Sequence, residues 1–127
     1  MNENFYLVYV TAKDHEEGKK IAIHLIEKKL AACANIFPIS SFYTWKKKLV
    51  EDNEVGIFIK TRKSLIDELI SEIKKIHSYD VPCIVSFKIE KGYTPYLNWI
   101  LDSTKESTKN KTCAVLKLVP LKKSRSC

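Results

Sequence analysis

The chain has 127 residues, of which 45% are hydrophobic and 29% charged, and this is the ordinary make-up of one soluble globular domain. No apolar run approaches the ~20 residues that a membrane-spanning helix needs. The first residues lack the basic stretch of a secretory signal. These observations argue against a membrane span and against secretion, so we expect a cytoplasmic location.

The net charge of +7 comes almost entirely from one end of the chain. Residues 1–102 contain 15 Lys and Arg against 14 Asp and Glu, whereas residues 103–127 contain seven against one. The body is therefore nearly neutral, and nucleic-acid binding is not expected of it. A basic extension can contact nucleic acid or an anionic membrane, but a solvated segment is the simpler interpretation. We predict a folded domain at 1–102 and a flexible basic extension at 103–127, with a further strand over 113–119 as the alternative.

Histidine and cysteine spacing gives no sign of a zinc site. No C-x-x-C pair occurs, and no two histidines have the H-x₃₋₅-H spacing of a zinc finger. Cys33 and Cys83 lie in apolar stretches, so we interpret both as core residues.

The first third of the chain predicts a strand followed by a helix. Residues 5–11 are aromatic and β-branched with little charge, which favours a strand in the interior of a sheet. Asp14 with Glu17 three residues later has the spacing of a capping box in its acidic form at a helix start. Apolar residues then recur at helical spacing as far as Leu30.

Residues 30–62 predict an unusually long hairpin. The first arm extends over 35–49, Glu51-Asp52-Asn53 has the composition of a turn, and 54–61 alternates like a strand. A small domain rarely needs so long a hairpin for its own core, which suggests a role in assembly.

The remaining elements complete a familiar order. Ser64 is the expected N-cap of a second amphipathic helix that ends near Ile76, residues 84–90 alternate as a fourth strand, and 96–101 form a short helix. The order βαββαβ plus a helix predicts an α+β, ferredoxin-like fold with an antiparallel sheet and both long helices on one face. The apolar side chains on the other face would then be exposed in a single subunit, and cyclic self-association would bury them.

Four stretches carry a resemblance to a known family. They are A-A-C-A-N-I-F-P-I-S-S-F-Y-T-W-K-K-K, I-K-T-R, I-H-S-Y-D-V-P and Y-L-N-W-I, in this order. Together they resemble the CutA divalent-cation-tolerance family over residues 5–101. The resemblance implies a ferredoxin-like subunit, a homotrimer joined through the long hairpins, and a role in the response to divalent metal ions. It also implies copper binding in some bacterial members, and no enzymatic reaction.

The metal ligands that the resemblance implies are mostly missing. They are a Cys at the end of the first strand and two adjacent His before Pro-Tyr. The corresponding residues here are Val10 and the run Ile76-His77-Ser78-Tyr79. His77 is therefore the one candidate metal ligand, and a structural His at a helix C-terminus is the alternative.

Six further residues are candidates for a pocket between subunits, where packing alone is the alternative explanation for the aromatic ones. Glu54 and Lys60 among them are either a buried polar pair or an exposed one. We hypothesise a non-enzymatic protein of divalent metal response; the alternative is a small-ligand sensor or protein-anchoring scaffold using such pockets. The sequence shows no nucleophile with a base adjacent to it, so no residue pattern favours an enzyme. The six candidates are Cys33, Tyr43, Trp45, Glu54, Lys60 and Tyr79.

Overall fold

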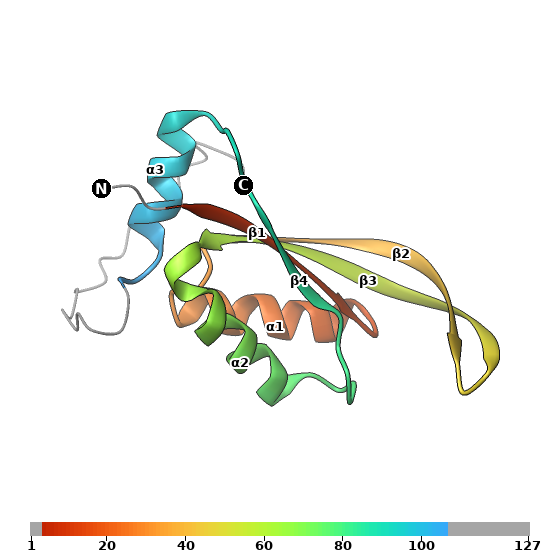
Figure 1. The fold of residues 1–127 in the computed structure, drawn as a ribbon. Helices are drawn as coiled ribbons and strands as arrows, with labels where there is room; N and C mark the ends of the chain where they lie inside the picture. Colours follow the sequence, from red (N-terminus) through yellow and green to blue (C-terminus); the bar gives the residue numbers. More distant parts are fainter. Residues whose placement is uncertain (1–3, 107–127) are drawn as a thin grey trace.

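The computed structural model describes residues 4–106 as four strands and three helices (Figure 1). The elements alternate as a βαββαβα series, with a 3-10 turn, η1, before the second α-helix. Their bounds are β1 Phe5–Ala12, α1 His15–Glu27, β2 Cys33–Trp45, β3 Lys48–Arg62, η1 Lys63–Leu65, α2 Ile66–Ile76, β4 Ile84–Lys88 and α3 Thr94–Ser103.

The strands form one antiparallel sheet in the order β2-β3-β1-β4. Helices α1 and α2 lie on one face of this sheet, and α3 lies at one end of it (Figure 1). The mixed α+β class with an antiparallel four-stranded sheet is therefore confirmed. The interior position expected for the first strand is also confirmed, because β1 pairs with β3 on one side and β4 on the other.

The core lies between the sheet and the two long helices. Alternate residues of β1 and β3 point toward the helices, as the period of two requires, and Val8, Val10, Ile57 and Ile59 are completely buried. The helices contribute apolar side chains at helical spacing, namely Ile21, Leu25, Leu69 and Ile73. Val10, the position at which the family resemblance implies a cysteine ligand, is thus a core residue.

The two helix starts differ from each other. Asp14 accepts a hydrogen bond from the Glu17 backbone N–H at 2.9 Å, so the N-cap half of the predicted capping box is confirmed. The Glu17 carboxylate accepts a hydrogen bond from the backbone N–H of Lys13 and not of Asp14. The predicted cap of the second helix is wrong, because Ser64 lies inside η1 and α2 begins at Ile66 without a side-chain cap.

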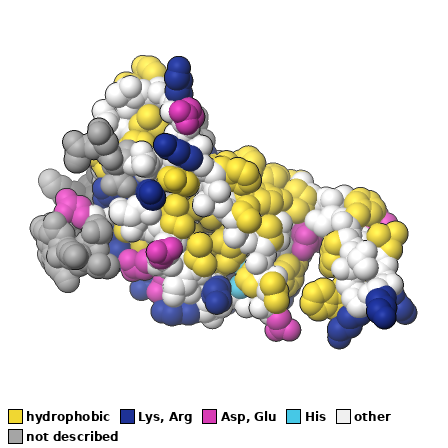
Figure 2. Space-filling view, viewed as in Figure 1, with side chains coloured by type: hydrophobic (Ala, Val, Ile, Leu, Met, Phe, Trp, Pro, Cys, Tyr) yellow, Lys and Arg dark blue, Asp and Glu magenta, His cyan; other side chains and the backbone are white. Residues whose placement is uncertain are grey.

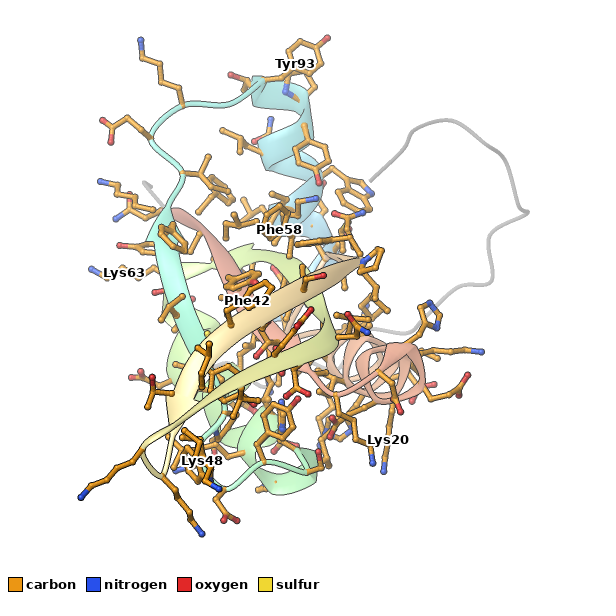
Figure 3. All side chains as sticks on the ribbon, turned by 90° about the vertical axis from the view of Figure 1, so that its right-hand side faces the viewer. Lys20, Phe42, Lys48, Phe58, Lys63 and Tyr93 are labelled. Carbon is orange, nitrogen blue, oxygen red and sulfur yellow. The ribbon has the colours of Figure 1, made fainter. Side chains whose placement is uncertain are left out.

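The hairpin turn lies earlier in the chain than its composition suggested. Trp45 pairs with Lys48, and the two residues between them, Lys46 and Lys47, have φ values of 52° and 65°. The residues predicted as the turn, Glu51-Asp52-Asn53, lie inside β3. The prediction failed because Lys has no special preference for left-handed backbone, whereas Asp and Asn do. Both arms project well beyond the rest of the sheet (Figure 3, near Lys48).

The sheet face opposite the helices carries a cluster of aromatic rings. Tyr9, Phe37 and Phe58 pack together there, with ring centroids 4.8–6.5 Å apart. Gly56 makes room for them, because a Cβ atom at this position would lie 2.8 Å from the Phe37 ring. Phe58, Val85 and Phe87 remain 38%, 45% and 55% exposed. Hydrophobic side chains gather over the sheet, and lysines gather at the hairpin tip (Figure 2).

The last elements are close to their expected positions. β4 ends at Lys88 rather than at residue 90, and α3 extends the predicted short helix in both directions. Arg62 then donates hydrogen bonds to the backbone oxygens of Thr104 and Lys105, which ties the segment after α3 to the sheet. The predicted flexible extension beyond residue 106 and the alternative strand over 113–119 lie outside the described residues. Within residues 4–106 no helix has the length and apolar character to cross a membrane.

Candidate ligand pocket

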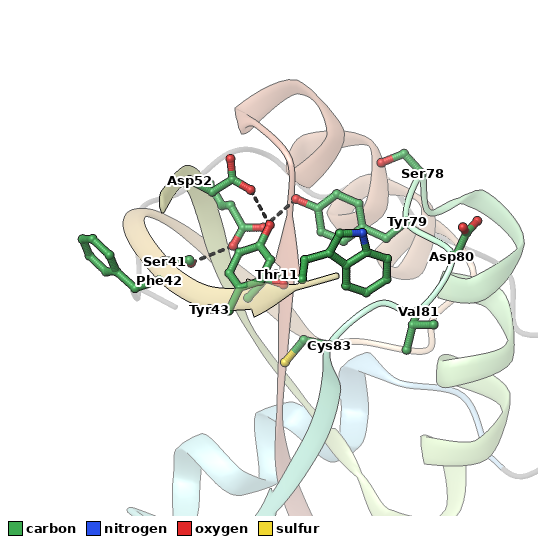
Figure 4. Close-up of a pocket in the computed structure, with 12 residues that line it drawn as sticks. Thr11, Ser41, Phe42, Tyr43, Asp52, Ser78, Tyr79, Asp80, Val81 and Cys83 are labelled. Atoms are coloured by element: carbon green, nitrogen blue, oxygen red, sulfur yellow. Dashed lines mark hydrogen bonds between the residues drawn. The ribbon is translucent and has the colours of Figure 1, made fainter. Parts of the chain in front are cut away.

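A cavity of about 650 Å³ opens beside the outer half of the hairpin (Figure 4). Its walls come from the end of β1, the outer parts of β2 and β3, and the loop between α2 and β4. These segments are far apart in the sequence, and they meet because the hairpin curves toward the loop. The lining residues are Thr11, Ser41, Phe42, Tyr43, Trp45, Asp52, Glu54, Ser78, Tyr79, Asp80, Val81 and Cys83.

Glu54 is the polar centre of this pocket. One carboxylate oxygen accepts a hydrogen bond from Ser41 Oγ at 2.7 Å, and the other accepts one from the Tyr79 hydroxyl at 2.6 Å. Ser41 lies on β2 and Tyr79 on the loop after α2, so this one carboxylate connects the hairpin to the body of the domain. Figure 4 shows both hydrogen bonds as dashed lines.

A second pair extends the polar wall along the hairpin. The Tyr43 hydroxyl donates a hydrogen bond to Asp52 Oδ2 at 2.6 Å. Asp52 and Glu54 are two residues apart on β3, so the pleat places both on the same face. Tyr43 and Ser41 have the same relation on β2, which is why the four polar groups converge.

The carboxylates give this part of the molecule a negative potential. The pKa of Tyr79 is raised, first by burial and then by its hydrogen bond to Glu54 and the charge of that residue. Cys83 is exposed as a residue, but partial desolvation of its thiol and the charge of Glu54 raise the pKa of that thiol. Burial and the charges of Cys83 and Glu54 act in the same direction on the pKa of Tyr9. Each shift means that further negative charge is disfavoured here.

The loop that carries Tyr79 is held by Glu17. The buried Glu17 carboxylate accepts hydrogen bonds from the backbone N–H and the hydroxyl of Ser78, at 2.7 and 3.0 Å, and from the backbone N–H of Lys13. Burial alone would raise the pKa of Glu17, but these hydrogen bonds lower it overall. The start of α1 thus positions one wall of the pocket.

His77 lies behind this wall, and its side chain is fully buried. Its Nε2 is 2.7 Å from the backbone oxygen of Thr11, which can only accept, so Nε2 carries the proton. Its Nδ1 accepts a hydrogen bond from the Tyr79 backbone N–H at 3.1 Å. Both ring nitrogens are therefore engaged in positioning the loop.

The six predicted pocket residues divide into two groups. Tyr43, Trp45, Glu54 and Tyr79 line the same cavity. Cys33 and Lys60 lie together on the inner half of the hairpin, where Lys60 Nζ is 3.7 Å from Cys33 Sγ and 2.6 Å from Asn35 Oδ1. Glu54 and Lys60 do not form a pair, because each has other partners. Burial lowers the pKa of Lys60.

Sequence reasoning missed several lining residues. The sequence predicts Asp52 in the turn, so it does not identify Asp52 as a neighbour of Glu54 on the same face of the strand. Cys83 was expected in the core, but this prediction is wrong: Cys83 is exposed at the pocket, whereas Cys33 is 2% exposed as expected. The pairing of Asp52 and Glu54 at a strand period was the signal available in the sequence.

The described residues of one chain do not fit a metal ion. Within residues 4–106 no three His, Cys, Asp or Glu side chains are grouped closely enough to hold one. His77 uses both nitrogens in other hydrogen bonds, and the positions of the other implied ligands are occupied by the buried Val10 and by Ile76, which packs against the core. A metal at His77 would need this ring to release a hydrogen bond, and its further donors would have to come from outside the described residues of one chain.

Known proteins of similar sequence share this architecture. A protein from Archaeoglobus fulgidus, called divalent-cation tolerance protein CutA, is 46% identical over 99 residues, which cover 78% of this chain and 96% of the relative. A human protein called CutA is 40% identical over 97 residues, which cover 76% of this chain and 54% of the human one. The crystal structure of CutA1 from Oryza sativa superimposes with a TM-score of 0.80 at 45% identity, covering 82% of this chain and 96% of that chain.

The family assignment follows from the length of the match. The sequence model described as CutA1 divalent ion tolerance protein matches residues 6–103, which include every helix and strand except the first residue of β1. All four stretches quoted from the sequence lie within this match. The chain belongs to the CutA1 divalent ion tolerance protein family.

Proposed function

We propose that this protein is a non-enzymatic, homotrimeric binding protein that acts in the tolerance of divalent metal ions. Membership of the family supports the metal-related role. The binding role rests on the pocket, where carboxylates and phenol groups converge from three parts of the chain. Both oxygens of Glu54 are held by hydrogen bonds, and the raised pKa of Cys83 is the opposite of an activated thiol. Such groups suit ligand binding and not nucleophilic catalysis. A cytoplasmic location stays a prediction.

A trimer is supported by the shape and surface of the subunit. The hairpin extends beyond the sheet, and the face opposite the helices exposes Phe58, Val85 and Phe87. Exposed apolar patches on a soluble chain commonly mark contacts with another chain, and symmetric copies are the commonest partners. In this proposal the ferredoxin-like subunits cover one another's open faces and hairpins.

Copper is the first metal to test, because the remaining candidate ligand is an imidazole. Copper(II) is titrated by calorimetry into the purified wild type, His77→Ala and His77→Gln. His24→Ala is the matched control, since His24 is a histidine on α1 that contacts Glu72 rather than the pocket. A site at His77 predicts binding in the wild type and the control that is lost in both His77 variants. Equal binding in all four proteins, or none in any, contradicts it.

A small-ligand sensor is the second candidate, and the cavity is the observation that favours it. Its volume of about 650 Å³ lies within the range of small-molecule sites, and a few convergent polar groups among aromatic walls are typical of them. Glu54 connects the hairpin to the loop after α2, so an occupant that altered these hydrogen bonds would change the position of the hairpin. Through the hairpin it would affect contacts between subunits.

A further inference from the structure

We propose that the pocket binds a small organic ammonium ion, with N-methylated cations as the best-fitting class. This rests on the small-ligand role proposed above for the same cavity and names the chemistry of its ligand. The inference stands on three features of the lining: its aromatic rings, its charge, and the existing hydrogen bonds of its carboxylates.

Aromatic rings form much of the wall. Tyr43 and Trp45 line the cavity from the end of β2, and Tyr79 lines it from the loop after α2, so aromatic side chains reach it from two different parts of the chain. Figure 4 shows Tyr43 and Tyr79 on these two sides. Trp45 remains 54% exposed and Tyr43 40% exposed in the subunit, although both are large side chains. Ring faces attract a cation that lies within about 6 Å of them, and tryptophan does so most strongly.

Among the described residues, the charged groups of the lining are all acidic. Asp52, Glu54 and Asp80 line the cavity, and no Lys, Arg or His is among the twelve described residues that do so. The raised pKa values of Tyr79 and Cys83, to which burial and the charge of Glu54 both contribute, are consistent with this field. A neutral or anionic ligand would gain nothing from it, whereas a cation would.

The carboxylates are poorly placed to coordinate an inorganic ion. Glu54 already accepts hydrogen bonds on both oxygens, and Asp52 accepts one from Tyr43. Magnesium and calcium require six or more oxygen ligands at short range, and magnesium gives up its water reluctantly. A fully methylated ammonium ion has no N–H group, so it needs neither free hydrogen-bond acceptors nor direct coordination. It uses the negative potential and the ring faces together, which is what this lining offers.

The test compares two probes of similar size and different charge. Tetramethylammonium and the neutral tert-butanol are titrated by calorimetry into the purified full-length protein at constant ionic strength, and magnesium is titrated separately. We expect tetramethylammonium to bind about tenfold or more tightly than tert-butanol, which is the scale of a desolvated cation–π contact. Trp45→Leu and Glu54→Gln should each weaken its binding several-fold. Glu90→Gln, an exposed acid outside the pocket, is the matched control and should bind like the wild type.

The outcomes separate this inference from the role on which it rests. Equal binding of both probes, lost in Trp45→Leu, would overturn cation selectivity and keep a small-ligand pocket. Binding of neither probe would overturn the ammonium site. Displacement of tetramethylammonium by magnesium at matched ionic strength would also overturn it and identify the cavity as a metal site. Circular dichroism of each variant establishes that the comparison is made between folded proteins.

Discussion

Glu17 holds the loop behind the pocket through its carboxylate. It is 7% exposed and accepts three hydrogen bonds from Lys13 and Ser78, two of them from backbone N–H groups. The sequence identified Glu17 only as the partner of a helix cap. Its second role, holding the loop after α2, joins residues 61 positions apart and could not be recognised from local spacing.

Replacing Glu17 by Gln should lower the free energy of unfolding by about 1–3 kcal/mol at neutral pH, because a buried charged acceptor loses its charge-assisted hydrogen bonds. The folded protein lowers the pKa of Glu17 from 4.5. Its stabilisation is therefore complete above the unfolded pKa and is lost as the pH falls through the folded one. The difference between wild type and variant should shrink below about pH 4.5.

Urea unfolding at pH 7 and at pH 3, at one protein concentration, measures this difference. Glu16→Gln is the matched control, because Glu16 is exposed on the same helical turn. A Glu17→Gln variant as stable as the control at pH 7 would show that the three hydrogen bonds contribute nothing net.

At the scale of elements, the β2–β3 hairpin differs most from its sequence-based prediction. The alternation of residues within each arm was recognised correctly, but the turn was placed at Asp52 instead of Lys46 and Lys47. As a result, residues 46–49 and 51–53 lie in elements that differ from the predicted ones, and Asp52 lies in β3 instead of in the turn. The left-handed lysines carry no compositional signal, so the register of the pairing had to come from the folded chain.

Replacing Lys46-Lys47 by Asn-Gly should stabilise the hairpin, because both positions have positive φ and this dipeptide is preferred in such two-residue turns. A non-glycine residue in the left-handed region costs about 1–2 kcal/mol, so a gain on the order of 1 kcal/mol is expected. Hydrogen exchange of the hairpin amides is the measurement, and exchange should slow. Lys48→Gly, in extended strand backbone, is the control and should speed it. Faster exchange in the Asn-Gly variant would contradict the assigned turn.

At the scale of the whole molecule, the open sheet face and the hairpin together support assembly. The residues that stay exposed there come from β3 and β4, and they lie opposite the helix-covered core. The sequence indicated that one face lacks helices. In the predicted βαββαβ order each long helix belongs to a crossover connection of the same sheet, and right-handed crossovers place both helices on one face.

Light scattering at micromolar concentration should give three times the mass of one chain. Phe87→Glu introduces a charge on the open face and should reduce this mass, whereas Ile23→Glu, at an exposed position on α1, should leave it unchanged. A wild-type mass equal to one chain would rule out the trimer. A mass unaffected by Phe87→Glu would place the contact elsewhere.

The sequence by itself determined the order of the elements and the family, because strand and helix periods are local properties and each of the four matching stretches is contiguous. The tertiary structure alone decided the pocket. Thr11, Ser41, Glu54 and Tyr79 become neighbours only when the hairpin curves over the loop after α2. That curvature depends on the turn at Lys46-Lys47, on the strand register and on the hydrogen bonds of Glu54, and none of these follows from local periodicity.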